Sequence, residues 1–577
     1  MIRALFAFVG VALSLSGCSG GGGGVPDATP AAVVDAHASA PDAAGAPDAA
    51  PGSPDAAGHP DAAGHPDAMA AADAAPATTY DLANPAPGEW PMFKRRLTHT
   101  GLVDPSEMVG KISAATVCKR WDRELTGENR GASGPLIARI AGTWTVLLSV
   151  AAPGGAGGRV WALDGANQGT PLWLPTFTEL PEGAFADNYA PLLADIDGDD
   201  GGTRELVAVS NNKNLAFALR TEDEGPGKAA GTVQWTFPMD RAGETSETGP
   251  AAANLDPSDA QLEVVFGSDS GGAEAAQVYV VGGATGHKKG TFTSRRRWDR
   301  DMQCANTNKI DSSSPAIADV GGLKVFVGSW DGTLYALEWR GAGAGGPGLF
   351  ERWRHELAVE DGLECGIRKI RNGPAIAQVV PGGPLEVAFG SMAQIQVGDD
   401  YTTAKVHLVS ADGGAGATLA ALGEVDLDDW KSSVSLADLV PGDGGRLEIA
   451  GGRVGGFHVA RASASGALSA GWQRDCTPML AGGCPGGAGP PPYGNRSSPA
   501  IADIDDDGEL EIIVGIEGTV NPGLVVLDGK TGDVEWRYAA GQVTSSPAVG
   551  DIDGDGELEI VFFTTSGQVI ALDSSCP

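Results

Sequence analysis

The chain has 577 residues, a formal net charge of −35, 42% hydrophobic residues and only 6% aromatic residues. A charge this negative argues against nucleic acid and anionic membrane surfaces as direct partners, because both would repel it. It suits a soluble protein outside the cytoplasm. The length allows one large repeat fold or several domains, and composition does not choose between them.

Residues 1–18 have the pattern of a secretion signal. Arg3 gives a positive charge, an apolar run covers 4–15, and LSGC at 15–18 ends the segment with small residues. The apolar run is too short for a permanent transmembrane helix. LSGC resembles the lipobox of bacterial lipoproteins. This resemblance implies lipidation of Cys18, and Ser19 after it implies sorting to the outer membrane; the alternative is an ordinary signal peptide with an incidental cysteine.

Residues 19–88 differ sharply in composition from the rest of the chain. They contain a glycine run and then recurrent Pro-Asp-Ala-Ala, with acids and no Lys or Arg. Such a segment cannot bury enough apolar surface to offset its chain entropy. We therefore expect a disordered tether, which spans up to about 200 Å when extended as polyproline II. The folded part is expected at 89–577.

A unit of about 50 to 65 residues recurs eight times in this folded part. Each copy holds four short runs of Val, Ile, Leu and aromatic residues separated by Gly or Asp, and no stretch keeps helical periodicity. These features predict an all-β fold, an eight-bladed β-propeller with four antiparallel strands in each blade. The copies begin at positions 134, 190, 249, 314, 373, 433, 498 and 546.

The ends of the array predict how the ring closes. The last copy stops one strand short, while 117–125, with Trp121, is an unmatched fourth strand at the front. Pairing the two ends would remove both exposed sheet edges.

The cysteines agree with such a closure. Six remain besides Cys18, which allows 15 pairings. Closure brings Cys118 beside Cys576, Cys304 and Cys365 occupy equivalent connections of adjacent blades, and Cys476 and Cys484 share one Gly/Pro-rich loop. We predict these three pairs as disulfides. A thiolate metal or redox site is the weaker interpretation, because the chain has no C-x-x-C.

The turn between the first two strands of copies seven and eight carries acids at positions 1, 3, 5 and 9 and glycine at 6. A hard cation such as calcium takes six to eight oxygen ligands, so the pattern predicts structural calcium; the last acid stands at 9 rather than 12, which excludes an EF-hand. The alternative is that Asp and Gly only form tight turns. The predicted ligands are Asp503, Asp505, Asp507 and Glu511, then Asp551, Asp553, Asp555 and Glu559, and in copy two, with two inserted residues, Asp195, Asp197, Asp199 and Glu205. Weaker versions are Asn254, Asp256 and Glu263 in copy three and Asp438, Asp443 and Glu448 in copy six.

Three stretches resemble known repeat families. SSPAIADIDDDGELEIIVG at 497–515 resembles FG-GAP and VCBS repeats. VLDGKTGDVEW at 526–536 and WPMFKRRLTHTG at 90–101 resemble quinoprotein-like (PQQ-like) propellers, in which a Trp packs between blades. The resemblance implies an eight-bladed propeller with calcium loops. Quinoprotein dehydrogenases also hold their cofactor over two adjacent cysteines, which this chain lacks.

The long connections between copies, at 174–189, 299–312, 355–371 and 473–495, are expected on the face opposite the acidic turns. Long loops on a rigid ring usually carry binding. We therefore expect a non-catalytic lipoprotein of the bacterial outer membrane, facing the periplasm or the exterior. Its propeller, a monomer, would bind a protein or glycan and no nucleic acid. The alternative is an enzyme on the same fold, a calcium-dependent polysaccharide lyase or a PQQ-dependent dehydrogenase, with His355 or Arg371 as a possible lyase base.

Overall fold

The computed structural model forms one compact unit at Ala74–Pro577 besides an N-terminal unit at Met1–Asp73. Within the described residues the regular structure is entirely β, and no helix has the length and apolar character needed to cross a membrane. The signal segment, Cys18 and nearly all of the tether lie outside this description. The described residues are 82–125, 134–151, 157–173, 178–180, 190–198, 202–210, 212–241, 243–269, 275–295, 309–310, 312–341, 346–359, 368–394, 401–413, 423–427, 432–453, 456–475, 497–517 and 522–576.

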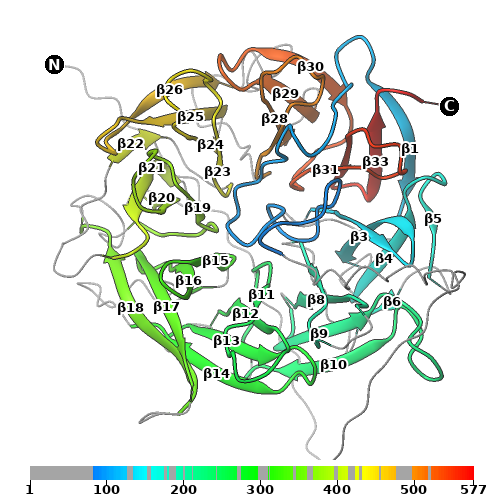
Figure 1. Ribbon diagram of the computed structural model, residues 1–577, viewed down its shortest axis with the longest axis vertical. Coiled ribbons are helices and arrows are strands. Elements are labelled where there is room, and N and C mark those ends of the chain that lie inside the picture. Colours follow the sequence, from blue (N-terminus) through cyan, green and yellow to red (C-terminus); the bar gives the residue numbers. More distant parts are fainter. Residues whose placement is uncertain are drawn as a thin grey trace, which may run out of the picture. The chain divides into compact units, whose positions relative to one another are not determined.

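Eight small antiparallel sheets follow one another around a ring (Figure 1). Seven are built from consecutive strands, and the eighth combines the two ends of the fold. The fold is an eight-bladed β-propeller, as predicted.

The strands of the first four blades are β2 (Leu136–Ile140), β3 (Thr143–Ala151), β4 (Gly158–Asp164), β5 (Thr170–Pro171) and β6 (Thr178–Glu179); β7 (Leu192–Ala194), β8 (Glu205–Val209), β9 (Leu215–Arg220) and β10 (Val233–Pro238); β11 (Ala251–Ala253), β12 (Glu263–Gly267), β13 (Gln277–Gly282) and β14 (Lys288–Thr293); and β15 (Ala316–Asp319), β16 (Leu323–Gly328), β17 (Thr333–Arg340) and β18 (Gly348–Glu356). Those of the last four are β19 (Ala375–Ala377), β20 (Glu386–Gln394), β21 (Tyr401–Ser410) and β22 (Gly423–Leu427); β23 (Ser435–Ala437), β24 (Glu448–Arg453), β25 (Gly456–Ala462) and β26 (Leu468–Asp475); β27 (Ala500–Ala502), β28 (Glu511–Ile516), β29 (Gly523–Asp528) and β30 (Val534–Ala539); and β31 (Ala548–Gly550), β32 (Glu559–Phe563), β33 (Gln568–Asp573) and β1 (Cys118–Glu124).

Burial along a blade explains its composition. The inner strands are short and rich in Ala, as in β11 (AAA) and β27 (AIA), because eight of them converge toward the axis. The second and third strands are buried on both faces by neighbouring blades and are runs of Val, Ile and Leu, as in β28 (EIIVGI) and β29 (GLVVLD). The outermost strand is only partly buried.

The Ser-Ser-Pro motif joins blades as well as strands. The Ser497 hydroxyl accepts the Gly515 N–H of its own blade at 2.9 Å, whereas the Ser498 hydroxyl accepts the Ser433 N–H of blade 6 at 3.0 Å. Both groups are buried, where an unpaired N–H would be costly. The same division of roles recurs at Ser545 and Ser546 and at Ser313 and Ser314.

Tryptophan on the fourth strand makes a second link between blades. Trp235 donates its indole N–H to the Gly283 carbonyl of the next blade at 2.6 Å, and Trp472 does the same to Gly529 at 2.8 Å. Trp121 of β1 bonds Gly165 of blade 1 at 2.8 Å. The predicted packing of Trp between blades is confirmed.

Ring closure also follows the prediction. β1 pairs antiparallel with β33, and Cys118 forms a disulfide with Cys576 at a Cα–Cα distance of 6.0 Å. The bond joins residues 458 positions apart. The other four cysteines, predicted to pair as Cys304–Cys365 and Cys476–Cys484, lie outside the described residues.

The axis of the ring holds the chain's own N-terminal segment, residues 88–103, which we call the axial segment (blue in Figure 1). It contacts the inner strands or first turns of seven blades through backbone hydrogen bonds or β-bridges. In order of blade, these pairs are Trp90 with Ile137, Pro91 with Leu193, Leu97 with Ile317, Thr98 with Ile376, Thr100 with Leu436, Gly101 with Ile501 and Gly88 with Asp551. The resemblance of residues 90–101 to propeller sequences did not predict that this segment lies on the axis of the ring.

Three basic residues of the axial segment are buried. Lys94 donates to the Ser435 hydroxyl and to the Pro499 carbonyl at 3.1 Å. The Arg95 guanidinium donates to backbone carbonyls and pairs with Glu107. Burial, and then the charge of Lys94, lower the pKa of His99 to about 3. Lys94, Arg95 and His99 also have positive φ angles of 59°, 70° and 56°, which fold the segment into tight turns.

Replacing Lys94 by methionine is expected to stabilise the protein near neutral pH. Burial lowers the pKa of Lys94 well below its ordinary value of 10.5. Because its pKa is lower in the folded than in the unfolded state, protonated Lys94 lowers the free energy of unfolding at low pH. This loss disappears as the pH rises through 10.5, above which Lys94 is neutral in both states. Lys94→Met should therefore raise the free energy of unfolding by on the order of 1 kcal/mol at pH 7 and by less at pH 10, as measured by urea unfolding.

Lys530→Met is the matched control, because the Lys530 side chain is 45% exposed. Its stability should stay close to that of the parent at both pH values. A loss of stability in Lys94→Met at pH 7 would show that the polar contacts of Lys94 outweigh the cost of burying its charge.

Candidate metal centres on the first turns

The predicted acidic turns lie between the first and second strands of blades 2, 7 and 8. In blade 7, β27 ends at Ala502, which pairs with Glu511 at the start of β28. This register closes the turn and gathers oxygens of Asp503, Asp505 and Glu511 within 4.8 Å of one another. The equivalent groups are Asp551, Asp553 and Glu559 in blade 8 and Asp195, Asp197 and Glu205 in blade 2.

The glutamate in each group has one bonded and one unbonded oxygen. Oε2 accepts the N–H of Ile504 at 2.8 Å in blade 7, of Ile552 at 2.7 Å in blade 8 and of Ile196 at 3.1 Å in blade 2. Oε1 is buried and has no hydrogen-bond partner in any of the three. An unpaired buried carboxylate oxygen is costly, so a ligand at this place would offset a real penalty.

Electrostatics point the same way. Burial, together with the charges of Glu535, Asp505 and Asp503, raises the pKa of Glu511 to about 9. Burial and neighbouring aspartates likewise raise the pKa of Glu205 to about 9 and that of Glu559 to about 10. A bound cation reverses this effect because it favours the charged carboxylates. A donor set made only of oxygens fits a hard cation such as calcium.

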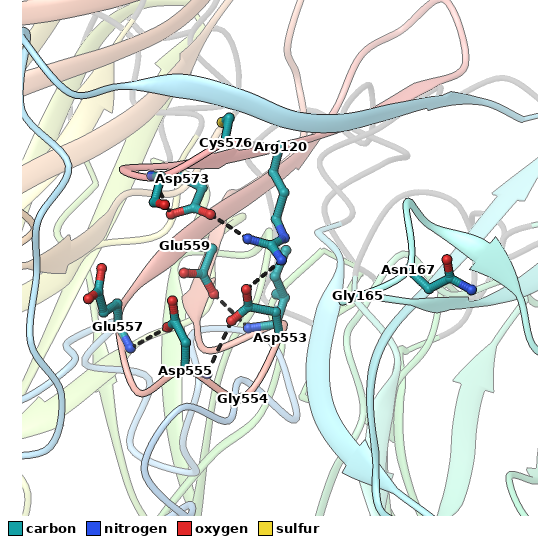
Figure 2. Close-up of polar contacts among 12 residues, drawn as sticks. Arg120, Gly165, Asn167, Asp553, Gly554, Asp555, Glu557, Glu559, Asp573 and Cys576 are labelled. Carbon is teal, nitrogen blue, oxygen red and sulfur yellow. Dashed lines mark hydrogen bonds and ion pairs between the residues drawn. The ribbon is translucent and has the colours of Figure 1, made fainter.

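The remaining predicted ligands lie outside these groups of three or outside the described residues. Asp507 accepts the Glu509 N–H at 2.8 Å, and Asp555 accepts the Glu557 N–H at 2.8 Å (Figure 2). These bonds shape the two turns, and neither aspartate belongs to a group of three. Asp199 of blade 2 lies outside the described residues.

The glycine at position 6 is required by the backbone. Gly508 and Gly556 have φ angles of 87° and 84°, a left-handed conformation that side chains disfavour. The sharp bend predicted there is confirmed. In the part of the chain that the structure describes, the weaker turns of blades 3 and 6 form no comparable group.

The opposite face of the ring carries a basic and aromatic patch. Trp330, in the turn between β16 and β17, has Arg371 stacked 4.2 Å from its ring centre, with Lys309 at 5.0 Å and Lys369 at 5.2 Å. The backbone N–H of Trp330 donates to the Lys309 carbonyl at 2.9 Å. The three cations come from the connections at 299–312 and 355–371, most of whose other residues lie outside the description. We call Lys309, Trp330, Lys369 and Arg371 the Trp330 patch.

His355, named with Arg371 as a possible lyase base, lies on β18 and pairs with Leu334 of β17. Its ring faces Phe389 at 6.3 Å, and Phe389 stacks on His407 at 4.8 Å. His407 in turn bonds the Ser391 hydroxyl at 2.7 Å, and burial lowers its pKa to about 3. The Ser391–His407 pair is enclosed within blade 5, which does not suit a nucleophile and base that must reach a substrate.

No protein-family model matches the chain, and no curated protein matches it. Among solved structures, the quinohemoprotein alcohol dehydrogenase from Comamonas testosteroni is similar, with a TM-score of 0.51 and 12% identity over 85% of this chain and 81% of that one. BamB from Moraxella catarrhalis gives a TM-score of 0.42 and 14% identity over 79% of this chain and 99% of that one. The likeness is one of fold. At 12% identity, the similarity to the dehydrogenase supports the propeller and assigns no activity.

Proposed function

We propose that this protein is an outer-membrane lipoprotein whose calcium-stabilised, non-catalytic propeller serves as a scaffold that binds a protein or glycan. The observation that carries this proposal is the axial segment. Ligand sites are usually concave, and the axis is the natural concavity of a ring. Here residues 88–103 fill that position and bond seven blades. Binding is thereby directed to the two faces of the ring.

The face of the inter-blade connections is the better candidate. On the other face, carboxylates are engaged in the proposed metal centres. The Trp330 patch combines the Arg371 guanidinium and a half-buried indole in a chain of net charge −35. Of its two lysines, Lys309 pairs with Asp269 at 2.5 Å and Lys369 is buried. Tryptophan and arginine are the side chains enriched where binding energy concentrates. The adjoining long connections give this face the variable surface that recognition requires.

The test is binding by the mature full-length chain to a glycan array and to solubilised envelope proteins. Trp330→Ala should weaken binding of any captured partner at least tenfold, the loss typical of a central aromatic contact. Trp144→Ala is the matched control, because Trp144 is a partly buried tryptophan beside Gly554 on the face of the acidic turns. Unchanged affinity after both Trp330→Ala and replacement of the long connections would refute the proposal. Fatty-acid labelling that persists in Cys18→Ser would refute the anchor.

The enzyme alternatives, a calcium-dependent polysaccharide lyase and a PQQ-dependent dehydrogenase, are favoured by fold alone. A spectrum with quinone absorbance in purified protein, or release of unsaturated sugar products from a uronate polymer, would replace the scaffold proposal by one of them.

A further inference from the structure

The fourth strand of several blades carries one extra residue beside the acidic turn. In blade 7, Val534 pairs with Leu527 and Trp536 with Val526, so Glu535 is bulged out of the ladder. A bulge re-aims a side chain and is a specific structural feature. The equivalent bulged residues are Gln234 in blade 2, Lys289 in blade 3, Arg352 in blade 4 and Arg120 in blade 8.

In blades 2 and 8 the bulged side chain reaches the acidic group. Gln234 donates to Asp197 at 3.0 Å in blade 2. Arg120 pairs with Asp553 at 2.5 Å and with Asp573 at 2.6 Å in blade 8 (Figure 2). In blade 7 the same bulged position beside the acidic turn holds Glu535. The same position thus presents an amide, a cation and an acid.

Blade 3 shows what a lysine does at this position. Its glutamate, Glu263, starts β12 as Glu511 starts β28, and its Oε2 accepts the Leu255 N–H at 2.8 Å. Its Oε1, the atom left unbonded in blades 2, 7 and 8, accepts the Lys289 ammonium at 2.6 Å. Lys289 also contacts Asp259 at 2.6 Å and Asp256 at 3.6 Å. An ammonium group therefore stands among the three carboxylates.

We propose that the bulged residue decides how each acidic turn is neutralised. Lys289 is a covalently attached substitute for the metal ion in blade 3. In blade 7, Glu535 at the bulged position adds negative charge beside the group of Asp503, Asp505 and Glu511 and makes this the tightest divalent site. In blade 8, Arg120 cancels part of the negative charge and makes the site weaker. Affinity for calcium rises with the negative charge at the site, so the expected order is blade 7, blade 2, blade 8.

This inference rests on the proposed binding of calcium, and the experiment separates the two. The mature full-length chain is dialysed against calcium, and bound metal is counted by elemental analysis while affinities are obtained by calorimetry. Lys289→Gln gives blade 3 the bulged residue of blade 2 and should bind one more calcium ion per chain than the parent. Glu535→Gln should raise the calcium Kd of the tightest site about tenfold or more. The number of calcium ions bound per chain should not change.

Arg352→Gln is the matched control. It changes the same bulged position in blade 4, where Lys324 stands in place of the glutamate and pairs with Glu338 at 3.4 Å. The number of bound ions should not change. Lys289→Arg, which retains the positive charge, should also bind no extra ion.

A parent protein that binds no calcium would refute the calcium-stabilised scaffold itself. A parent that binds calcium, with the same count in Lys289→Gln and the same tightest affinity in Glu535→Gln, would refute only the role of the bulged residue. Because the affinity of Glu535→Gln is measured independently, the inference stays testable even when Lys289→Gln fails to fold.

Discussion

Replacing Cys118 by serine is expected to lower the free energy of unfolding of the ring by several kcal/mol. The Cys118–Cys576 disulfide closes a loop of 458 residues, for which chain-entropy arguments give about 6 kcal/mol as an upper estimate. The bond also holds β1 against β33, so its loss favours opening of a sheet edge. Urea unfolding followed by tryptophan fluorescence measures the change.

Two further variants control this experiment. Cys576→Ser should lose the same stability as Cys118→Ser. The double variant should lose no more than either single variant, because all three variants lack the same disulfide. A double variant as stable as the parent would show that strand pairing alone closes the ring. Greater loss in the double variant would assign the thiols some role besides this bond.

Removal of calcium is expected to cause the second large effect, a lower Tm. A ligand present at 100 times its Kd stabilises a protein by about 2.7 kcal/mol at each site. The unbonded oxygens of Glu511 and Glu559 make these turns costly without an ion. Calorimetry with excess calcium and then with excess chelator should show Tm falling by roughly 2 to 5 °C.

The turn of blade 7 should account for much of this difference. Asp505→Asn removes one carboxylate of its acidic group and should reduce the difference in Tm between calcium and chelator. Asp319→Asn is the matched control, because Asp319 ends β15 directly before the first turn of blade 4, where Lys324 replaces the glutamate. Equal melting curves with calcium and chelator for the parent protein would contradict calcium as a stabilising ion.

The sequence alone predicted much of the fold and part of the candidate site. Eight copies of one local pattern predicted eight blades, because each blade is built from consecutive strands whose burial is repeated around the ring. The incomplete last copy and the unmatched strand at 117–125 predicted the closure and the Cys118–Cys576 bond. Asp503, Asp505 and Glu511 were predicted because they lie within nine residues, where turn geometry nearly decides their distances.

Only the tertiary structure decided the features that depend on distant parts of the chain. The axial segment bonds residues up to 463 positions away, as from Gly88 to Asp551, and no local pattern encodes such pairs. Lys289 reaches Glu263 from two strands away, and it does so because a bulge turns its side chain toward the acidic turn. A one-residue shift in register reverses which face a strand residue points to. Sequence periodicity therefore located the acidic turns, but strand register decided what neutralises each of them.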